Sequence, residues 1–154
     1  MWPVRRALFL VLSILFLAGC GGGGGGGGGS QRLSRDEYAA KADAICSKYN
    51  KLTSSAGTPK DLASLAKAFD KALPLLDNAL AELRKLEPPK NEQHTVDRWL
   101  AQSQVLKRDL QEMRDQARAK NLKGVQDAFA RASANDKQGN KLAAELGMKV
   151  CSKG

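Results

Sequence analysis

The chain has 154 residues, of which 42% are hydrophobic and 27% charged, enough for one domain with its own core. Its formal net charge is +9, but basic side chains are interleaved with acidic ones, as in Lys107-Arg108-Asp109. The absence of a continuous basic stripe or a known binding motif argues against a nucleic-acid partner.

The first 19 residues have the composition of a secretory signal. Arg5 and Arg6 precede an apolar stretch, residues 7–16, that is interrupted only by Ser13, and small residues follow it. The apolar stretch is about half of the ~20 residues that a transmembrane helix needs. We therefore expect a signal peptide over residues 1–19 and no permanent membrane span.

The end of this segment carries a specific resemblance. Leu17-Ala18-Gly19-Cys20 resembles the lipobox of bacterial lipoproteins at all four positions and in its distance from the N-terminus. The resemblance implies cleavage after Gly19, diacylglycerol on Cys20, and a protein held at the extracytoplasmic face of the cell membrane. The alternative is an ordinary secretory signal with a cysteine that happens to lie there.

Nine glycines, residues 21–29, follow Cys20 directly. Such a sequence has almost no preferred backbone conformation and is typical of a flexible tether. Counted over residues 21–33, its reach is about 20 Å at ~5–6 Å times the square root of its length. We therefore divide the rest of the chain into a lipidated cysteine with its linker, residues 20–33, and a bundle domain, residues 34–154.

The bundle domain is rich in strong helix formers, and its apolar residues repeat with helical period. The first predicted helix begins at a capping box formed by Ser34 and Glu37 and ends before a turn at residues 53–57. The second begins at Pro59, with Thr58 as its N-cap. Both helices are long enough to span a small domain.

Two further helices complete the prediction. The third follows the Glu87-Pro88-Pro89 break and covers about residues 90–119, and the fourth covers about residues 122–146 before a C-cap at Gly147. Each predicted helix has one apolar stripe that is expected to face inward. In the first two helices the stripes are Tyr38, Ala42, Ile45, Tyr49 and Leu52, and then Leu62, Leu65, Phe69, Leu73, Leu76, Leu80 and Leu83. In the third helix the stripe is Val96, Trp99, Leu100, Leu106, Leu110, Met113 and Ala117, and in the fourth it is Leu122, Val125, Phe129, Ala132, Leu142 and Leu146. Long helices with short connections predict an all-α protein, an antiparallel four-helix bundle.

Two cysteines remain once Cys20 is assigned to lipid. Cys46 lies beside the apolar stripe of the first helix, and Cys151 lies beyond the end of the fourth. Because an exported location permits disulfides, we predict a structural bridge between Cys46 and Cys151. The alternative, a redox pair, lacks the Cys-X-X-Cys spacing that tunes such thiols.

The layout also resembles a group of small actinobacterial lipoproteins and secreted proteins. This resemblance covers most of the mature chain and rests on Tyr38 with residues 41–46 (KADAIC), on Glu87-Pro88-Pro89, and on residues 146–151 (LGMKVC). It implies the paired cysteines and the helical bundle, and it brings no assigned activity.

No catalytic or metal-binding constellation is visible in the sequence. His94 is the only histidine, whereas transition-metal sites need several ligands and a general-base histidine needs an orienting partner. We therefore expect no enzyme, no catalytic residues, no metal site and no cofactor.

The apolar stripe of the fourth helix weakens between Ala132 and Leu142. Small and polar residues lie there, and Ser103 occupies the middle of the third helix. We take Ser103, Asn135 and Asp136 as a candidate ligand layer between the third and fourth helices. The interpretation favoured by composition alone is an exposed or frayed stretch, because a helical glycine costs about 1 kcal/mol relative to alanine.

The expected function is that of a membrane-anchored lipoprotein acting as a binding or interaction module of the cell envelope. Beyond the lipid on Cys20, its partners would be anionic envelope polymers or another envelope protein, although the charge of +7 that remains without Arg5 and Arg6 also fits a solvated helical surface. The alternative is a small-ligand carrier or sensor. A cavity lined by the candidate ligand layer would favour the carrier, and a closed core with an exposed apolar patch would favour protein interaction.

Overall fold

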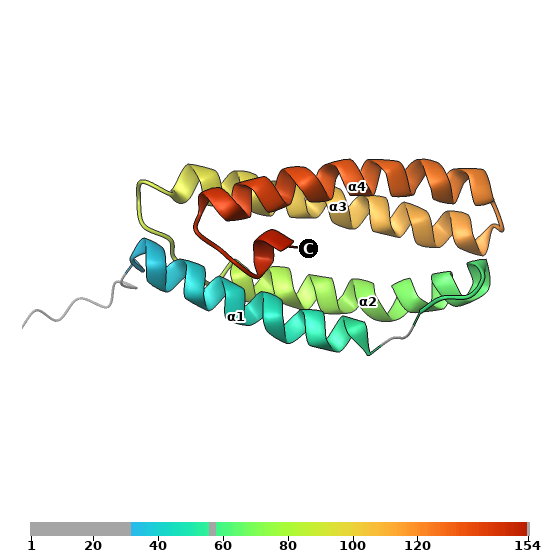
Figure 1. The fold of residues 1–154 in the computed structure, drawn as a ribbon, viewed down its shortest axis with the longest axis horizontal. Helices are drawn as coiled ribbons and strands as arrows, with labels where there is room; N and C mark the ends of the chain where they lie inside the picture. Colours follow the sequence, from blue (N-terminus) through green and yellow to red (C-terminus); the bar gives the residue numbers. More distant parts are fainter. Residues whose placement is uncertain (1–31, 56–57, 154) are drawn as a thin grey trace, which may run out of the picture.

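The computed structural model describes residues 32–55 and 58–153 (Figure 1). These residues form α1 (Arg35–Ser54), α2 (Leu62–Leu83), α3 (Gln93–Arg118), α4 (Leu122–Glu145) and the short 3-10 helix η1 (Cys151–Lys153). No strand occurs in these two ranges, so the predicted all-α class and four-helix bundle are confirmed. The predicted signal peptide, Cys20 and the glycine linker lie outside the described residues.

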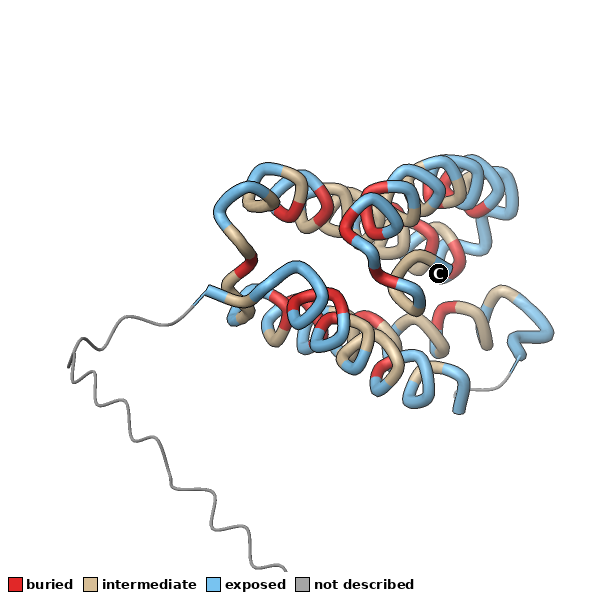
Figure 2. The backbone as a smooth tube through the Cα atoms, turned by 60° about the vertical axis from the view of Figure 1, so that its left-hand side comes forward, coloured by how far each residue is buried: buried red, intermediate tan, exposed pale blue. Residues whose placement is uncertain are grey.

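Consecutive helices pack against each other and run in alternate directions along the bundle (Figure 1). Among the consecutive pairs, α3 and α4 share the most extensive contact. After α4 the chain turns back, and η1 packs against both α4 and α1. This C-terminal segment lies between α4 and α1 in both Figure 1 and Figure 2. The bundle is therefore antiparallel, as predicted, and its last residues bridge the first and last helices.

The beginning of α1 is capped as predicted. The Glu37 backbone N–H donates to the Ser34 hydroxyl at 3.3 Å, and the Ser34 backbone N–H donates to the Glu37 carboxylate at 2.9 Å. These reciprocal bonds satisfy donors that a helix N-terminus otherwise leaves without partners. The Ser34 hydroxyl also donates to the Glu37 carboxylate at 2.7 Å, and this bond, together with the one from the Ser34 backbone N–H, holds the pKa of the Glu37 carboxyl below its ordinary value.

The start of α2 and the position of Leu52 differ from the prediction. The N-cap of α2 is Asp61, whose carboxylate accepts the Ser64 backbone N–H at 2.6 Å, so Thr58 and Pro59 precede the helix. A carboxylate that accepts the third backbone N–H gives a complete cap without them. Leu52 is 44% exposed because it lies on the last turn of α1.

The chain enters the bundle beside the Pro-Pro loop. The Leu33 backbone N–H donates to the Glu87 carbonyl at 2.9 Å, and the Arg32 guanidinium donates to the carbonyl of the buried Pro88 at 2.9 Å. The Arg35 guanidinium also donates to the carbonyl of Glu145 at the end of α4. The point where the predicted tether joins the domain is therefore fixed at the end of the bundle where α1 begins and α4 ends.

The main hydrophobic core occupies this end of the bundle, and buried positions face inward along all four helices (Figure 2). It comprises Tyr38, Ala39, Ala42, Leu80, Leu83, Val96, Trp99, Leu142, Ala143, Leu146 and Met148. Two smaller clusters lie toward the opposite end, around Met113 and around Ala117. The core is thus divided along the length of the bundle.

The Tyr38 side chain belongs to the main core and is 1% exposed. Its hydroxyl has no hydrogen-bond partner among the described residues. Burial, with a smaller contribution from the charge of Asp97, raises its pKa to about 12. Tyr38 therefore stays neutral at any physiological pH, because burial disfavours its charged form.

The prediction that Leu122 and Phe129 face inward is wrong, because they are 57% and 61% exposed. The buried face of α4 in this region is formed by Val125, Ala128 and Ala132. One residue along a helix is a rotation of about 100°, so Phe129 points away from the face that Ala128 presents to the core. Two of these three side chains are alanines, whereas the apolar periodicity of the sequence assigns the face to the larger Leu122 and Phe129 as well.

Candidate functional site

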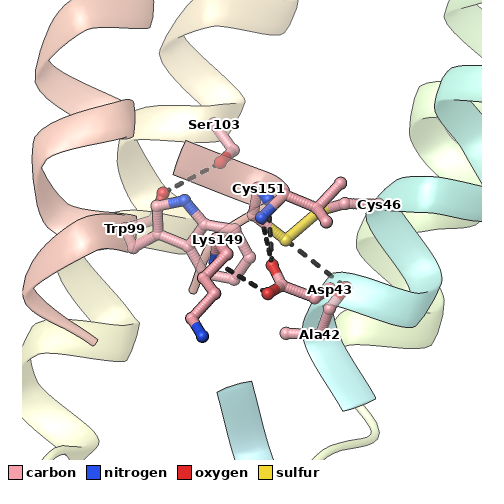
Figure 3. The surroundings of a disulfide bond; sticks show 8 residues. Ala42, Asp43, Cys46, Trp99, Ser103, Lys149 and Cys151 are labelled. Carbon is pink, nitrogen blue, oxygen red and sulfur yellow. Dashed lines mark hydrogen bonds between the residues drawn. A yellow bond between two sulfur atoms is a disulfide. The ribbon is translucent and has the colours of Figure 1, made fainter. Parts of the chain in front are cut away.

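The predicted disulfide joins α1 to the C-terminal segment. Cys46 and Cys151 are bonded, their Cα atoms lie 5.4 Å apart, and they are separated by 105 positions in the chain (Figure 3). We call residues 147–153 the C-terminal strap. It begins at Gly147, whose φ of +81° confirms the predicted glycine cap. Met148, which follows, is buried in the main core.

A carboxylate on α1 holds the strap at a second point. Asp43 accepts three consecutive backbone N–H groups, from Lys149 at 2.7 Å, Val150 at 2.9 Å and Cys151 at 3.0 Å (Figure 3). Hydrogen bonds to an ionised carboxylate are stronger than those between neutral groups. Asp43 precedes Cys46 by three residues, so both side chains lie on one face of α1. That spacing was a usable signal in the sequence, and the role of Asp43 was not predicted from it.

Beside the strap, the four helices surround a partly open cavity of about 240 Å³. All four helices and the disulfide line it. Its apolar wall is formed by Leu76, Ala79, Leu80, Leu83, Leu106 and Leu110, its aromatic side chains are Tyr49 and Trp99, and its polar side chains are Asn50, Thr53, Gln102, Ser103, Asn135, Asp136 and Asn140. The structure thus brings the candidate ligand layer of Ser103, Asn135 and Asp136 together at one cavity.

The Asn135 side chain is committed to the contact between α3 and α4. It accepts from the Gln102 amide at 2.8 Å and donates to the Asp109 carboxylate at 2.5 Å. Asp109 is only 9% exposed, and its carboxylate lies 3.5 Å from the Arg131 guanidinium. Because a buried carboxylate needs such partners, Asn135 serves the packing of the two helices rather than a ligand. The burial of Asp109 was not predicted from the sequence.

Ser103 and Asp136 are engaged only in part. The Ser103 hydroxyl donates to the Trp99 carbonyl at 2.9 Å, and one Asp136 oxygen, Oδ2, accepts from the Asn140 amide at 2.9 Å. For the other Asp136 oxygen, Oδ1, the described ranges contain no hydrogen-bond donor and no ion pair. Asp136 therefore retains an acceptor that a ligand can use.

Tyr49 is held in the cavity wall by a polar link to α2. Its hydroxyl donates to the Glu82 carboxylate at 2.6 Å, and the Lys48 ammonium binds the same oxygen at 2.7 Å. The hydrogen bond from Lys48 is the main reason why the pKa of Glu82 is lowered, and the hydrogen bond to Glu82 is the main reason why the pKa of Tyr49 is raised. The Tyr49 ring is therefore a neutral and fixed part of the wall.

Gly139 lines the cavity without a structural need for glycine. A Cβ added there would meet only the Gln102 Cγ at 3.8 Å, an ordinary contact. Gly139→Ala is therefore expected to raise the free energy of unfolding by about 0.5–1 kcal/mol, because alanine loses less backbone entropy on forming a helix. Urea denaturation monitored by circular dichroism measures this gain.

Gly124 provides the matched control within α4. A Cβ at that position would lie 2.3 Å from the Gln116 Oε1, which accepts a hydrogen bond from Asn121. Gly124→Ala must displace that side chain and is expected to stabilise less than Gly139→Ala. An equal or larger gain at Gly124 would show that the space around the two glycines is not what decides the effect.

In the two described ranges, no group of three or more His, Cys, Asp or Glu side chains could hold a metal ion, and His94 is exposed. No helix in the same ranges is long and apolar enough to cross a membrane. No family model matches the chain, and neither the curated proteins nor the solved structures include a significant match. Function must therefore be argued from the cavity itself.

Proposed function

We propose that the protein is a lipid-anchored binding protein of the cell envelope that takes a small molecule into the cavity between its four helices. The observation that carries the proposal is the cavity of about 240 Å³, with Ser103, Asn135 and Asp136 in its wall. A concave, mostly apolar site with a few polar groups is typical of small-molecule binding. Of the two functions expected from the sequence, the geometry favours the carrier.

The volume of the cavity supports a ligand of modest size. An engineered apolar cavity of about 150 Å³ binds benzene, and sites for drug-sized molecules start at about 300 Å³. The cavity falls between these values. The disulfide forms part of its wall, so a bound ligand would contact Cys151 of the strap as well as the four helices.

The anchoring part of the proposal rests on the lipobox resemblance of residues 17–20 and on the disulfide. A structural disulfide fits an exported domain, because cytosolic thiols are kept reduced. Arg32 and Leu33 fix the chain at one end of the bundle, so the glycine-rich tether before them would place that end at a typical distance of no more than about 20 Å from the membrane.

Cys20→Ser is expected to abolish labelling of the protein by fatty acid, because serine lacks the thiol that carries the lipid. When the Cys20→Ser chain is exported on an ordinary cleavable signal, it is expected in the soluble envelope fraction or the medium. Metabolic labelling and cell fractionation measure both effects, with the wild-type chain on its own signal as the reference. Labelling that persists in the Cys20→Ser chain would contradict lipidation at Cys20.

A second candidate function is supported by a different surface. Leu122 and Phe129, seven residues apart on α4, are exposed on nearly the same side of that helix. Large apolar side chains that share one exposed face form a patch of the kind that can mark a protein contact. An envelope protein that binds this face of α4 is therefore the alternative to the small-molecule function.

A further inference from the structure

The cavity wall has an unusual charge for this protein. Although the chain carries an excess of basic residues, none of the cavity-lining residues in the described part is basic, and Asp136 is the only charged one. Its carboxylate is half-buried and forms no ion pair within the described ranges. A carboxylate that is partly removed from water without a cation is stabilised by a positively charged ligand and repels an anion.

Aromatic side chains lie in the same wall. Trp99 on α3 is 5% exposed and Tyr49 on α1 is 8% exposed, and both line the cavity. The Trp99 ring lies beside Cys151 at the strap end of the site (Figure 3). The faces of such rings attract ammonium groups, and the Lys48 ammonium already lies 4.8 Å from the centre of the Tyr49 ring. Trp99 is therefore the aromatic side chain that the ammonium group of a ligand would meet.

The remaining residues of the cavity wall indicate the size and polarity of the rest of the ligand. Leucines of α2 and α3, including Leu76, Leu106 and Leu110, form an apolar surface that suits a ring or a short hydrocarbon chain. By proportion to the cavity that binds benzene, the volume corresponds to a body on the order of ten non-hydrogen atoms.

We propose that the ligand is a small organic cation, an amine with an apolar body, whose ammonium group pairs with Asp136 beside the Trp99 ring. This inference rests on the proposed small-molecule function and names its ligand class. Asn135 is not part of the recognition, because its side chain is already shared between Gln102 and Asp109.

Trp99 provides the readout for the test. Trp2 lies in the predicted signal peptide, so Trp99 is the only tryptophan in residues 20–154. The probes are three molecules of nearly equal size and different charge: 2-phenylethylamine, 2-phenylethanol and phenylacetate. Each is titrated at pH 7 into residues 20–154 carrying Cys20→Ser, with Trp99 fluorescence and isothermal calorimetry as the two measurements.

The amine is expected to bind about tenfold or more tightly than the alcohol, and the acid more weakly than both. Asp136→Asn keeps the shape and an oxygen that can accept from Asn140, and it is expected to reduce the amine affinity to the level of the alcohol. Asp127→Asn removes the same charge from an exposed position on α4 that pairs with Lys123, and it is expected to leave all affinities unchanged.

The contrary outcomes separate the two proposals. Equal binding of amine and alcohol, or an amine affinity unchanged in Asp136→Asn, would overturn the cation inference and leave the small-molecule function intact. Absence of binding by all three probes in both measurements would also overturn the cation inference, whereas the small-molecule function is tested separately by the native mass of the protein purified from its host.

Discussion

The double substitution Cys46→Ala, Cys151→Ala is expected to lower the free energy of unfolding by about 4 kcal/mol, the largest effect of any change considered for this domain. The bridge closes a loop of 105 positions, and cross-linking a loop of that length removes much of the conformational freedom of the unfolded chain. Domains of this size are typically stable by about 5–15 kcal/mol in total. Loss of the bridge therefore leaves a domain close to its unfolding limit.

Chemical and thermal denaturation of the unlipidated Cys20→Ser protein measure this effect. The unfolding temperature is expected to fall by roughly 10–20 °C for a loss of this size in a domain of this length. The control is the protein with both cysteines present whose disulfide is chemically reduced before unfolding, since it keeps both cysteine side chains and loses only the covalent bond. A decrease of less than about 1 kcal/mol in both proteins would contradict a stabilising role for the bridge.

The second large effect is expected at Asp43. Asp43→Ala removes a carboxylate that accepts three backbone N–H groups of the strap, and we expect a loss of about 3 kcal/mol, because hydrogen bonds to charged groups contribute more than neutral ones. Hydrogen exchange of the Lys149, Val150 and Cys151 amides is expected to accelerate, since their acceptor is gone. Denaturation and exchange together separate a local release of the strap from global destabilisation.

Asp43→Asn is the matched control for this change. An asparagine that keeps its oxygen at the Oδ1 position can still accept from Val150 and Cys151, while its amide group faces the Lys149 N–H. The loss is therefore expected to be intermediate between wild type and Asp43→Ala. If Asp43→Ala unfolds at the wild-type denaturant concentration and its three strap amides exchange no faster, the strap is not held by this carboxylate.

The helices of the bundle are predictable because local signals determine them. The capping box at Ser34 and the glycine cap at Gly147 act within one turn of the chain, and both are present in the structure. The disulfide follows from counting cysteines once Cys20 is assigned to lipid. These features need no knowledge of which helix lies beside which.

Features that depend on how neighbouring helices pack side by side are harder to predict from the sequence. The buried face of α4 is built on alanines such as Ala128, so the larger Phe129 indicated the wrong side of the helix. Asp109 looked like an exposed charge, yet it is buried because Asn135 and Arg131 on α4 lie opposite it. Such partners come from another helix and have no fixed spacing in the chain.

The candidate site was accessible only in part. The weak apolar stripe of the fourth helix marked Asp136, and Ser103 was marked as a polar residue in the middle of the third helix; both side chains line the cavity. The cavity itself is the space that the side chains of four helices and the strap leave unfilled between them. No single stretch of sequence determines such a space. The sequence also does not show that Asn135 and Asp136 have different roles. Asn135 is hydrogen-bonded between Gln102 and Asp109, whereas one oxygen of Asp136 is free of hydrogen bonds within the described residues, and both facts depend on the three-dimensional arrangement.

Native mass spectrometry of the Cys20→Ser protein, purified from the envelope of its own host, tests the small-molecule function most directly. The predicted result is a stoichiometric extra mass that survives gentle desolvation, persists in Gly139→Ala and is lost in Gly139→Leu, whose larger side chain fills the cavity that Gly139 lines. A bare monomer mass for the Cys20→Ser protein and for both glycine variants would contradict the small-molecule function and would direct the search to a protein partner on the Leu122 and Phe129 face of α4.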